Sequence, residues 1–305
     1  MKKYILNVPN LLFVILAALV SFAPSRLDAR NPMSPAFAFV IAIIAVEVFF
    51  LYKLKSGRDA TATKDIAAFA YAALLLWELL TSKLDILKYI FVPAPENVFY
   101  VFVKFGLTIL SGFERSMLLL TAGFSAALFF GVLLGILIGW TPRLRNAVFP
   151  VVKVFSTVPA LIYTPYLVVL MPTFATASIL VIFLGIFWST LMNTINDVGT
   201  IDKRIIDSAK ILNVKTKVML FQVILPYLLP RIINSLSVQL NISVMTLNAA
   251  ELIGADRGMG YFVKRSIDYA NYDQAIAGII FIAIVLTALN SLILVAKGKL
   301  IKWHY

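Results

Sequence analysis

The feature of this sequence that most constrains its fold is a succession of long apolar runs. A hydrocarbon core about 30 Å thick is crossed by about 20 apolar residues in a helix. Strands of a membrane β-barrel would alternate apolar and polar residues instead of running continuously apolar. The runs therefore predict an all-α, polytopic helical membrane protein with spans near residues 5–23, 36–54, 66–82, 116–140, 147–171, 176–198, 232–253 and 275–296.

The composition agrees with a membrane protein. Of the 305 residues, 61% are hydrophobic and 14% are charged, and the mean hydropathy is +0.93. A soluble domain carries about 25% charged residues. The net charge of +12 also fits a membrane protein. With both termini in the cytoplasm, most Lys and Arg fall in cytoplasmic segments, as the positive-inside rule predicts. We therefore expect the lipid bilayer as a partner and no nucleic acid.

Several kinds of chemistry are missing from the sequence. There is no cysteine, and the single histidine is His304 at the C-terminal end. Disulfides, thiol catalysis and a histidine metal cluster are therefore excluded. The phosphate-binding motif G-x-x-x-x-G-K-[ST] does not occur, so the chain is not expected to bind ATP in that way. We predict that it is not an enzyme, with no catalytic residue, no metal site and no cofactor of its own.

The N-terminal part of the chain reads as an addition to a six-span unit. We assign residues 1–63 to two extra spans and a basic linker, and residues 64–305 to the six-span core. Met1-Lys2-Lys3 followed by an apolar run and Ser21-Phe22-Ala23 also resembles a secretory signal. We expect this segment to be retained as a span, and its cleavage would not change the topology of the remainder.

Two features of the core predict local structure. Small residues recur at every fourth position of the fourth span, which places them on one helix face where a neighbouring helix can approach closely: Gly123, Ala127, Gly131, Gly135 and Gly139. Between the third and fourth spans, alternate prolines in Phe91-Val-Pro-Ala-Pro-Glu-Asn97 disfavour helix in the residues before them. They predict an extracytoplasmic turn that leads into a surface helix.

The fifth span, 147–171, contains three prolines together with Ser156, Thr157 and Tyr163. Proline removes backbone hydrogen bonds that lipid cannot replace, so this helix should lie inside the bundle. It either lines a solute pathway or is a kinked packing helix, and the sequence leaves both interpretations open.

The seventh span is the most polar. One stripe contains Asn234, Ser237, Asn241 and Asn248, with Glu251 at its edge, and an opposite stripe contains Ser235, Gln239, Ser243 and Thr246. We predict that one stripe faces a water-filled route and the other a neighbouring helix, although interhelical hydrogen bonds alone would explain either. The candidate pathway residues are Ser156, Thr157, Tyr163, Asn241, Asn248 and Glu251. For the intramembrane Glu47 and Glu78 we expect pairing or snorkelling.

A basic, polar segment at 200–230, here named the coupling loop, carries a family resemblance. Asp207-Ser208-Ala209, Asn213 and Ile224-Leu225-Pro226 resemble the EAA loop of bacterial ABC importer permeases, E-A-A-x-x-x-G followed by I-x-L-P. Asp207 replaces Glu, Ser208 replaces Ala and Asn213 replaces Gly. Asparagine is the common substitute where a left-handed backbone is needed.

The resemblance extends over about 64–296. The pieces that carry it are Trp77-Glu78, Phe91–Val98, Arg115–Phe124, Gly131–Gly135, Ser156–Leu161, Pro165, Ala250–Gly254 and Gly258–Val263. Together they are similar to the subgroup that imports aliphatic sulfonates, taurine, nitrate, bicarbonate or thiamine-pyrimidine precursors. Two departures are the additional residues 1–54 and Met171–Ser178, which replaces a glycine-rich segment.

The resemblance implies a type I ABC importer permease core with two extra N-terminal transmembrane helices. A separate ATPase subunit, which binds ATP and Mg, would dock on the coupling loop through Asp207, Ser208, Ala209, Lys210, Asn213, Leu225 and Pro226. A second copy of the permease would complete the pathway, and an extracytoplasmic solute-binding protein would deliver the solute. The expected location is the bacterial cytoplasmic (inner) membrane, with both termini in the cytoplasm. An ATP-independent secondary carrier or channel for small polar solutes, and an anchor subunit without a pathway, are the alternatives.

Overall fold

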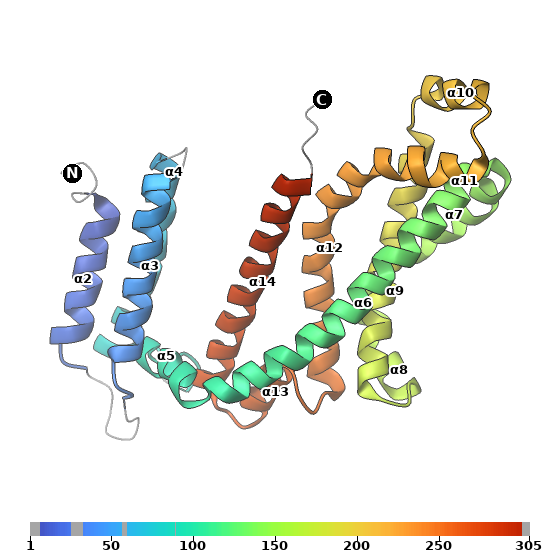
Figure 1. The fold of residues 1–305 in the computed structure, drawn as a ribbon. Coiled ribbons are helices and arrows are strands. Elements are labelled where there is room, and N and C mark those ends of the chain that lie inside the picture. The colour runs from blue at the N-terminus through green and yellow to red at the C-terminus, as the bar shows by residue number, and fades with distance from the viewer. Residues whose placement is uncertain (1–6, 26–32, 57–59, 89, 301–305) are drawn as a thin grey trace. The chain divides into compact units, whose positions relative to one another are not determined.

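The computed structural model describes residues 7–25, 33–56, 60–88 and 90–300. The features noted at Met1-Lys2-Lys3 and His304 lie outside these residues. The described residues form helices and turns without strands, which confirms the all-α prediction. Figure 1 shows the helices α2 (Val8–Phe22), α3 (Phe37–Ser56), α4 (Ala60–Glu78), α5 (Pro95–Lys104), α6 (Gly106–Trp140), α7 (Pro142–Ser156), α8 (Ala160–Leu170), α9 (Phe174–Gly199), α10 (Lys203–Ile211), α11 (Thr216–Val218), α12 (Leu225–Gly254), α13 (Met259–Asp268) and α14 (Tyr272–Leu300). Two π-helical turns, η1 (Leu79–Lys83) and η2 (Met219–Ile224), extend α4 and precede α12.

Six helical segments of the described residues are long and apolar enough to cross a membrane. They are Phe37–Lys55, Ala60–Lys83, Gly106–Trp140, Phe174–Gly199, Thr216–Gly254 and Tyr272–Lys299. The first predicted span, 5–23, contains α2, an apolar helix of 15 residues. At 1.5 Å per residue α2 is only about 22 Å long, which is less than the hydrocarbon core.

The fifth span is interrupted, as its three prolines predict. Instead of a single helix over 147–171, α7 and α8 meet at an angle of 89°, and only together do they reach the length of a span. The break falls at Thr157–Pro159, where Pro159 is the N-cap of α8. Pro150 and Pro165 lie inside α7 and α8, respectively. The interruption expected from three prolines is therefore concentrated at one.

The chain divides into two compact units, and the first contains residues 1–110 and 262–280. Within this unit α2, α3 and α4 share a buried apolar cluster around Leu16, Phe39 and Tyr71. The Tyr71 hydroxyl donates a 2.8 Å hydrogen bond to Glu47 Oε2, so Glu47 is paired as expected. The division of the chain at residue 63 made from the sequence remains a prediction.

The first unit also contains a buried charge cluster at the end of α4. Lys83 Nζ lies 3.3 Å from Glu78 Oε1 and donates a 2.9 Å hydrogen bond to the Ala23 carbonyl beyond α2. The Ser82 hydroxyl lies 3.4 Å from Glu96 Oε1 on α5. Burial, and then the nearby Glu78 carboxylate, raises the pKa of Glu96 to about 7. Glu78 is therefore paired, as expected for a carboxylate in a span.

Helix α5 follows a turn, as the sequence predicts. Ala94 is its N-cap and Pro95 occupies the first turn, a position where proline's missing N–H costs nothing. Its first turn, including Pro95, Glu96 and Asn97, is buried within the first unit. The predicted turn before this helix is confirmed.

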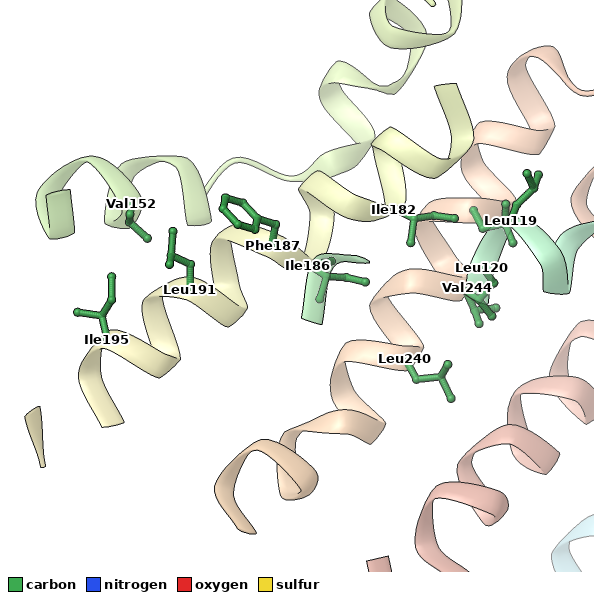
Figure 2. Close-up of a cluster of buried hydrophobic side chains, with 12 residues drawn as sticks. Leu119, Leu120, Val152, Ile182, Ile186, Phe187, Leu191, Ile195, Leu240 and Val244 are labelled. Atoms are coloured by element: carbon green, nitrogen blue, oxygen red, sulfur yellow. The ribbon is translucent and has the colours of Figure 1, made fainter. Parts of the chain in front are cut away.

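The second unit contains residues 111–261 and 281–305, and α9 is its central helix. Helix α9 packs against α7, α8 and α12. Figure 2 shows the apolar side chains that fill this region: Leu119 and Leu120 from α6, Val152 from α7, Ile182, Ile186, Phe187, Leu191 and Ile195 from α9, and Leu240 and Val244 from α12.

The small-residue face of α6 packs against α9, as the sequence predicts. A Cβ placed on Gly131 would lie 2.9 Å from Thr190 Cβ, and one on Gly135 would lie 2.5 Å from Thr194 Cβ. Real Cβ atoms do not approach so closely. Glycine at these positions therefore sets the separation between the two helices.

Replacing Gly135 by alanine should destabilise the protein. Alanine favours helix over glycine by about 0.5–1 kcal/mol, but the overpacked contact with Thr194 costs about 1–3 kcal/mol. We expect Gly135→Ala to lower the melting temperature of the purified chain. The matched control is Gly298→Ala on α14, where a Cβ meets nothing within 4 Å. Equal stabilisation by both substitutions would contradict the close α6–α9 contact.

Candidate functional site

The coupling loop follows α9 and contains the short helix α10, visible beyond the ends of α9 and α12 in Figure 1. Asp202 begins α10 as its N-cap, and its carboxylate accepts a 2.9 Å hydrogen bond from the Arg204 N–H. This bond satisfies one of the four N–H groups that a helix start leaves unpaired. The polar sequence thus forms a defined nine-residue helix rather than an irregular loop.

The far end of α10 is closed by a Schellman motif. Asn213 has φ of 53°, in the left-handed region, which confirms the expectation for this position. The Asn213 N–H donates to the Lys210 carbonyl over 2.9 Å, and the Val214 N–H donates to the Ala209 carbonyl over 3.1 Å. These two bonds are the pair that defines the motif.

The inner side of α10 packs on the rest of the second unit. Ala209 is buried, and Ile206 and Val214 pack with it against a cluster that includes Met219 and Ile224 of η2. Leu225, another residue predicted to contact the ATPase, packs against the same cluster, beneath α10. The hydrogen bonds and the apolar contacts together hold α10 as one piece with the start of α12.

The outer side of α10 is exposed. Asp207, Ser208 and Lys210 lie on it, and the Asp207–Lys210 distance of 3.9 Å makes a weak, solvated ion pair. Pro226 is exposed in the first turn of α12. The structure thus places Asp207, Ser208 and Lys210 on the exposed side of α10. Ala209 lies on the buried side of the same helix, and Leu225 belongs to the cluster against which α10 packs.

Sequence reasoning missed the two most exposed apolar residues of this segment. Ile211 and Leu212, at the end of α10, are 81% and 77% exposed. The sequence signal was ambiguous, because the polar, basic stretch between Lys203 and Lys217 contains two pairs of large apolar residues, Ile205-Ile206 and Ile211-Leu212. The exposure of Ile211 and Leu212 makes them an apolar tip surrounded by cations.

Two of the three predicted pathway residues on the broken span, Ser156 and Thr157, lie at its break. The Ser156 hydroxyl donates to the Lys153 carbonyl over 2.9 Å and the Thr157 hydroxyl to the Val154 carbonyl over 2.7 Å. Both bonds satisfy carbonyls at the end of α7. Tyr163 lies half-buried on α8.

The predicted pathway residues on α12 have different surroundings. Asn241 Oδ1 accepts a 2.8 Å hydrogen bond from Asn290 Nδ2 of α14. Asn248 is half-buried, and its Oδ1 has no hydrogen-bond partner among the described residues. A polar cavity lies between α9 and α12, and its lining includes Ser235 and Gln239 of the second stripe instead.

Glu251 is held in a buried clasp. Its carboxylate is fully buried and accepts hydrogen bonds from the Ser116 hydroxyl at 2.5 Å and the Gly260 N–H at 2.7 Å. The Ser116 oxygen in turn accepts a 2.9 Å bond from the Met259 N–H. At Gly258, which has φ of 142°, the Glu251 carboxylate occupies the space that a Cβ would need. Glu251 therefore joins α6, α12 and the start of α13.

These geometries can be compared with known proteins. The family profile described as "Binding-protein-dependent transport system inner membrane component" matches residues 127–302, more than half of the chain. The taurine transport system permease protein of Escherichia coli (strain K12) is 29% identical over 249 residues, covering 79% of this chain and 90% of the relative. A protein of Bacillus subtilis (strain 168) named for aliphatic sulfonates transport is 28% identical over 234 residues, covering 75% and 83%. The nitrate import permease protein of Leptolyngbya laminosa is 29% identical over 171 residues, covering 56% and 61%.

The chain therefore belongs to the family of inner-membrane components of binding-protein-dependent transport systems. It is a multi-pass membrane permease of the ABC importer class, in the subgroup that contains the sulfonate, taurine and nitrate permeases. Its role is transport, in agreement with the non-enzymatic chemistry expected from the sequence.

Asn213 gives a direct test of the closure of α10. A β-branched residue in the left-handed region costs about 1–2 kcal/mol, whereas glycine adopts it freely. We expect Asn213→Val to accelerate amide exchange over residues 209–214 severalfold and Asn213→Gly to leave it unchanged or slower. Equal protection in both variants would contradict the Schellman closure.

Glu251 gives a second test. Glu251→Ala leaves the Gly260 N–H and the Ser116 hydroxyl without their acceptor, and each unsatisfied buried group costs about 1–3 kcal/mol. We expect a large fall in the melting temperature. Asp256→Ala, which removes an exposed carboxylate from the segment after α12, is the control and should change it little. An unchanged melting temperature for Glu251→Ala would show that the clasp does not hold these helices.

Proposed function

We propose that this chain carries a small solute into the bacterial cytoplasm and that separate ATPase subunits drive it by docking on the coupling loop. The observation that carries this proposal is the apolar tip formed by Ile211 and Leu212 at the end of the rigidly closed helix α10. On this proposal the coupling residues are Asp207, Ser208, Ala209, Lys210, Asn213, Leu225 and Pro226. We add Ile211 and Leu212 to them because both are exposed at the end of α10.

The exposed tip favours protein contact over solvent. Burying a large aliphatic side chain stabilises a complex by about 1.5–3 kcal/mol. Ile211 and Leu212 lie between the exposed cations Lys210 and Lys215. We therefore expect the complementary surface on the ATPase to be an apolar groove with acidic residues at its rim.

The contacts of α10 allow a displacement of this helix to pass to the membrane helices. The Schellman motif and the Ala209 contacts fix α10 to η2 and the start of α12. Arg231 of α12 forms a 3.0 Å ion pair with Asp197 of α9 and a 2.5 Å hydrogen bond with the Thr200 hydroxyl. A movement of α10 therefore passes to both α9 and α12, and we propose that ATP-driven closure of the ATPase pair moves these helices together.

The remaining partners follow from the class of transporter. We propose that a second copy of this chain completes the pathway and that an extracytoplasmic solute-binding protein delivers the solute. ATP and Mg belong to the ATPase subunits, and this chain supplies no cofactor. We propose that the coupling loop and both termini lie on the cytoplasmic side of the bacterial inner membrane, which agrees with the basic residues of the loop.

The substrate proposal rests on the relatives. Their names specify taurine, aliphatic sulfonates and nitrate. We propose that this chain carries a small solute of these kinds, an organosulfonate or a nitrate-like anion. A thiamine-precursor pyrimidine is the alternative carried over from the sequence. We propose Ser156, Thr157, Tyr163, Asn241 and Asn248 as pathway residues. We propose that Glu251 contributes to the pathway by joining α6, α12 and the start of α13.

The double substitution Ile211→Ser with Leu212→Ser tests the docking proposal. Losing two buried aliphatic contacts of about 1.5 kcal/mol each should weaken ATPase binding by about 100-fold or more. The melting temperature of the permease should stay unchanged, because both side chains are already in solvent. Co-purification of the ATPase and ATP-dependent uptake are the measurements.

The control is Ile267→Ser on α13, another exposed isoleucine, which should leave ATPase binding intact. Undiminished ATPase binding by the double variant would contradict docking at α10. Uptake by the chain in vesicles without any ATPase would favour the secondary carrier instead.

A further inference from the structure

A cavity of about 520 Å³ lies between α2 and α3, within the first unit. Cavities that hold small molecules measure about 300–1,000 Å³. One wall is Glu47 of α3, and the other comes from the start of α2: Asn7, Val8, Asn10, Leu11, Phe13 and Val14. All of these residues precede 127–302, the part of the chain that matches the family profile. The cavity therefore belongs to the N-terminal helices of this chain and not to the matched region.

Glu47 occupies a core position of α3. Ile43 and Phe50, one turn to either side on the same helix face, are 2% and 4% exposed, and Glu47 itself is 8% exposed. The Tyr71 hydroxyl donates its 2.8 Å hydrogen bond to Glu47 Oε2. An uncharged glutamine would accept the same bond through its amide oxygen. The bond to Tyr71 therefore does not explain why a carboxylate occupies this position.

The charge of Glu47 lacks a cationic partner within the part of the chain that the structure describes. The ion pairs formed there involve other side chains. Glu47 Oε1 accepts no hydrogen bond from the described residues and is not one of their shielded, unpartnered oxygens, so it remains accessible. A carboxylate within a membrane span is costly unless a partner reaches it, and such a group marks a functional site. Because Glu47 lines the cavity, a cation in the cavity can supply that partner.

The start of α2 brings the membrane surface close to Glu47. Asn7 is the N-cap of α2 and lines the same cavity as Glu47. The 15 residues of α2 span only about 22 Å, less than the hydrocarbon core of about 30 Å. A short apolar helix thins the bilayer around it, which draws polar headgroups toward its ends. A headgroup at the start of α2 can therefore reach the Glu47 carboxylate.

The apolar walls of the cavity suit acyl chains. Val8, Leu11 and Val14 line it and are 65%, 62% and 59% exposed. They lie three positions apart on α2, so they form one continuous apolar stripe beside the cavity. On α3, Val48 and Phe49 next to Glu47 are also exposed. A soluble amine would leave these walls uncovered, whereas the chains of a lipid would cover them.

We propose that this cavity binds one phospholipid whose headgroup carries a primary ammonium group, as in phosphatidylethanolamine. The ammonium donates a hydrogen bond to Glu47 Oε1 and supplies its counter-charge, and the acyl chains run along α2 over Leu11 and Val14. The headgroup of phosphatidylcholine carries the same charge but has no N–H to donate, and that of phosphatidylglycerol carries no cation. The site is independent of the docking of ATPase subunits on the coupling loop.

Native mass spectrometry of the purified full chain tests the site, because it counts the lipid molecules that each protein molecule retains. The chain is released from detergent micelles that contain one added lipid at a time: phosphatidylethanolamine, phosphatidylcholine or phosphatidylglycerol with identical acyl chains. We expect one phosphatidylethanolamine to bind about tenfold more tightly than either other lipid, the effect of one charge-assisted hydrogen bond.

Two variants should remove this preference in different ways. Glu47→Gln should lower the affinity for phosphatidylethanolamine to that for phosphatidylcholine without lowering the melting temperature, because the amide still accepts the bond from Tyr71. Leu11→Trp keeps the carboxylate but fills the cavity with a large ring, and it should also abolish retention of the lipid. The matched control is Glu114→Gln, which removes an exposed carboxylate of α6 outside the cavity and should leave lipid binding intact.

Equal affinity for phosphatidylethanolamine and phosphatidylcholine would overturn the proposal, and so would binding that Glu47→Gln leaves unchanged. Binding that appears only after Lys2→Gln and Lys3→Gln would overturn it as well, because the chain's own cations would then be the occupant. Selective binding of one phosphatidylethanolamine, lost in both Glu47→Gln and Leu11→Trp, would support the lipid site.

Discussion

The close approach of α6 to α9 is the contact on which the second unit depends. Glycines at 131 and 135 bring the α6 backbone against Thr190 and Thr194, where any larger residue would clash. Small residues allow such contacts between membrane helices, whose association lacks a hydrophobic driving force within lipid. Because α9 is fixed in this way, packing on α6 places both its polar face and its last turn, which leads into the coupling loop.

Helix α10 of the coupling loop is fixed to the membrane helices on one side and exposes apolar residues at its C-terminal end. It is fixed by the closure at Asn213 and by the buried Ala209, whereas Ile211 and Leu212 are exposed. A helix that is fixed at its base and apolar at its exposed end is suited to transmit the movement of a docked partner. A flexible loop would absorb the movement of a docked partner, and a loop without an apolar end would bind it weakly.

Much of this arrangement could be predicted from the sequence because its signals are local. The length of the apolar runs predicted the spans, and the spacing of the glycines predicted the close-packing face of α6. The match of Asn213 to the glycine of the family's loop predicted its left-handed backbone. The break of the fifth span was less accessible, because proline alone does not say which of three positions will bend. Proline is tolerated inside α7 and α8, and only Pro159 begins a new helix.

The partners of polar side chains were the least predictable part of the site. From the sequence, Glu251 was predicted to be a pathway residue. The hydrogen bonds that it accepts from Ser116 and Gly260 could not be predicted, because they depend on how separate helices pack. Likewise Ser235 and Gln239 read only as a polar stripe, until α9 was placed opposite them. Periodicity identifies which residues share a face, but it does not identify what that face meets.

The most direct measurement of the central claim uses Leu212→Cys as the single thiol of the transporter. If α10 is the cytoplasmic contact of the ATPase, this thiol should form a cross-link with a cysteine in the apolar groove of the ATPase. It should also resist membrane-impermeant reagents added outside intact cells. Modification from outside, or no cross-link to the ATPase in an actively transporting complex, would contradict the account.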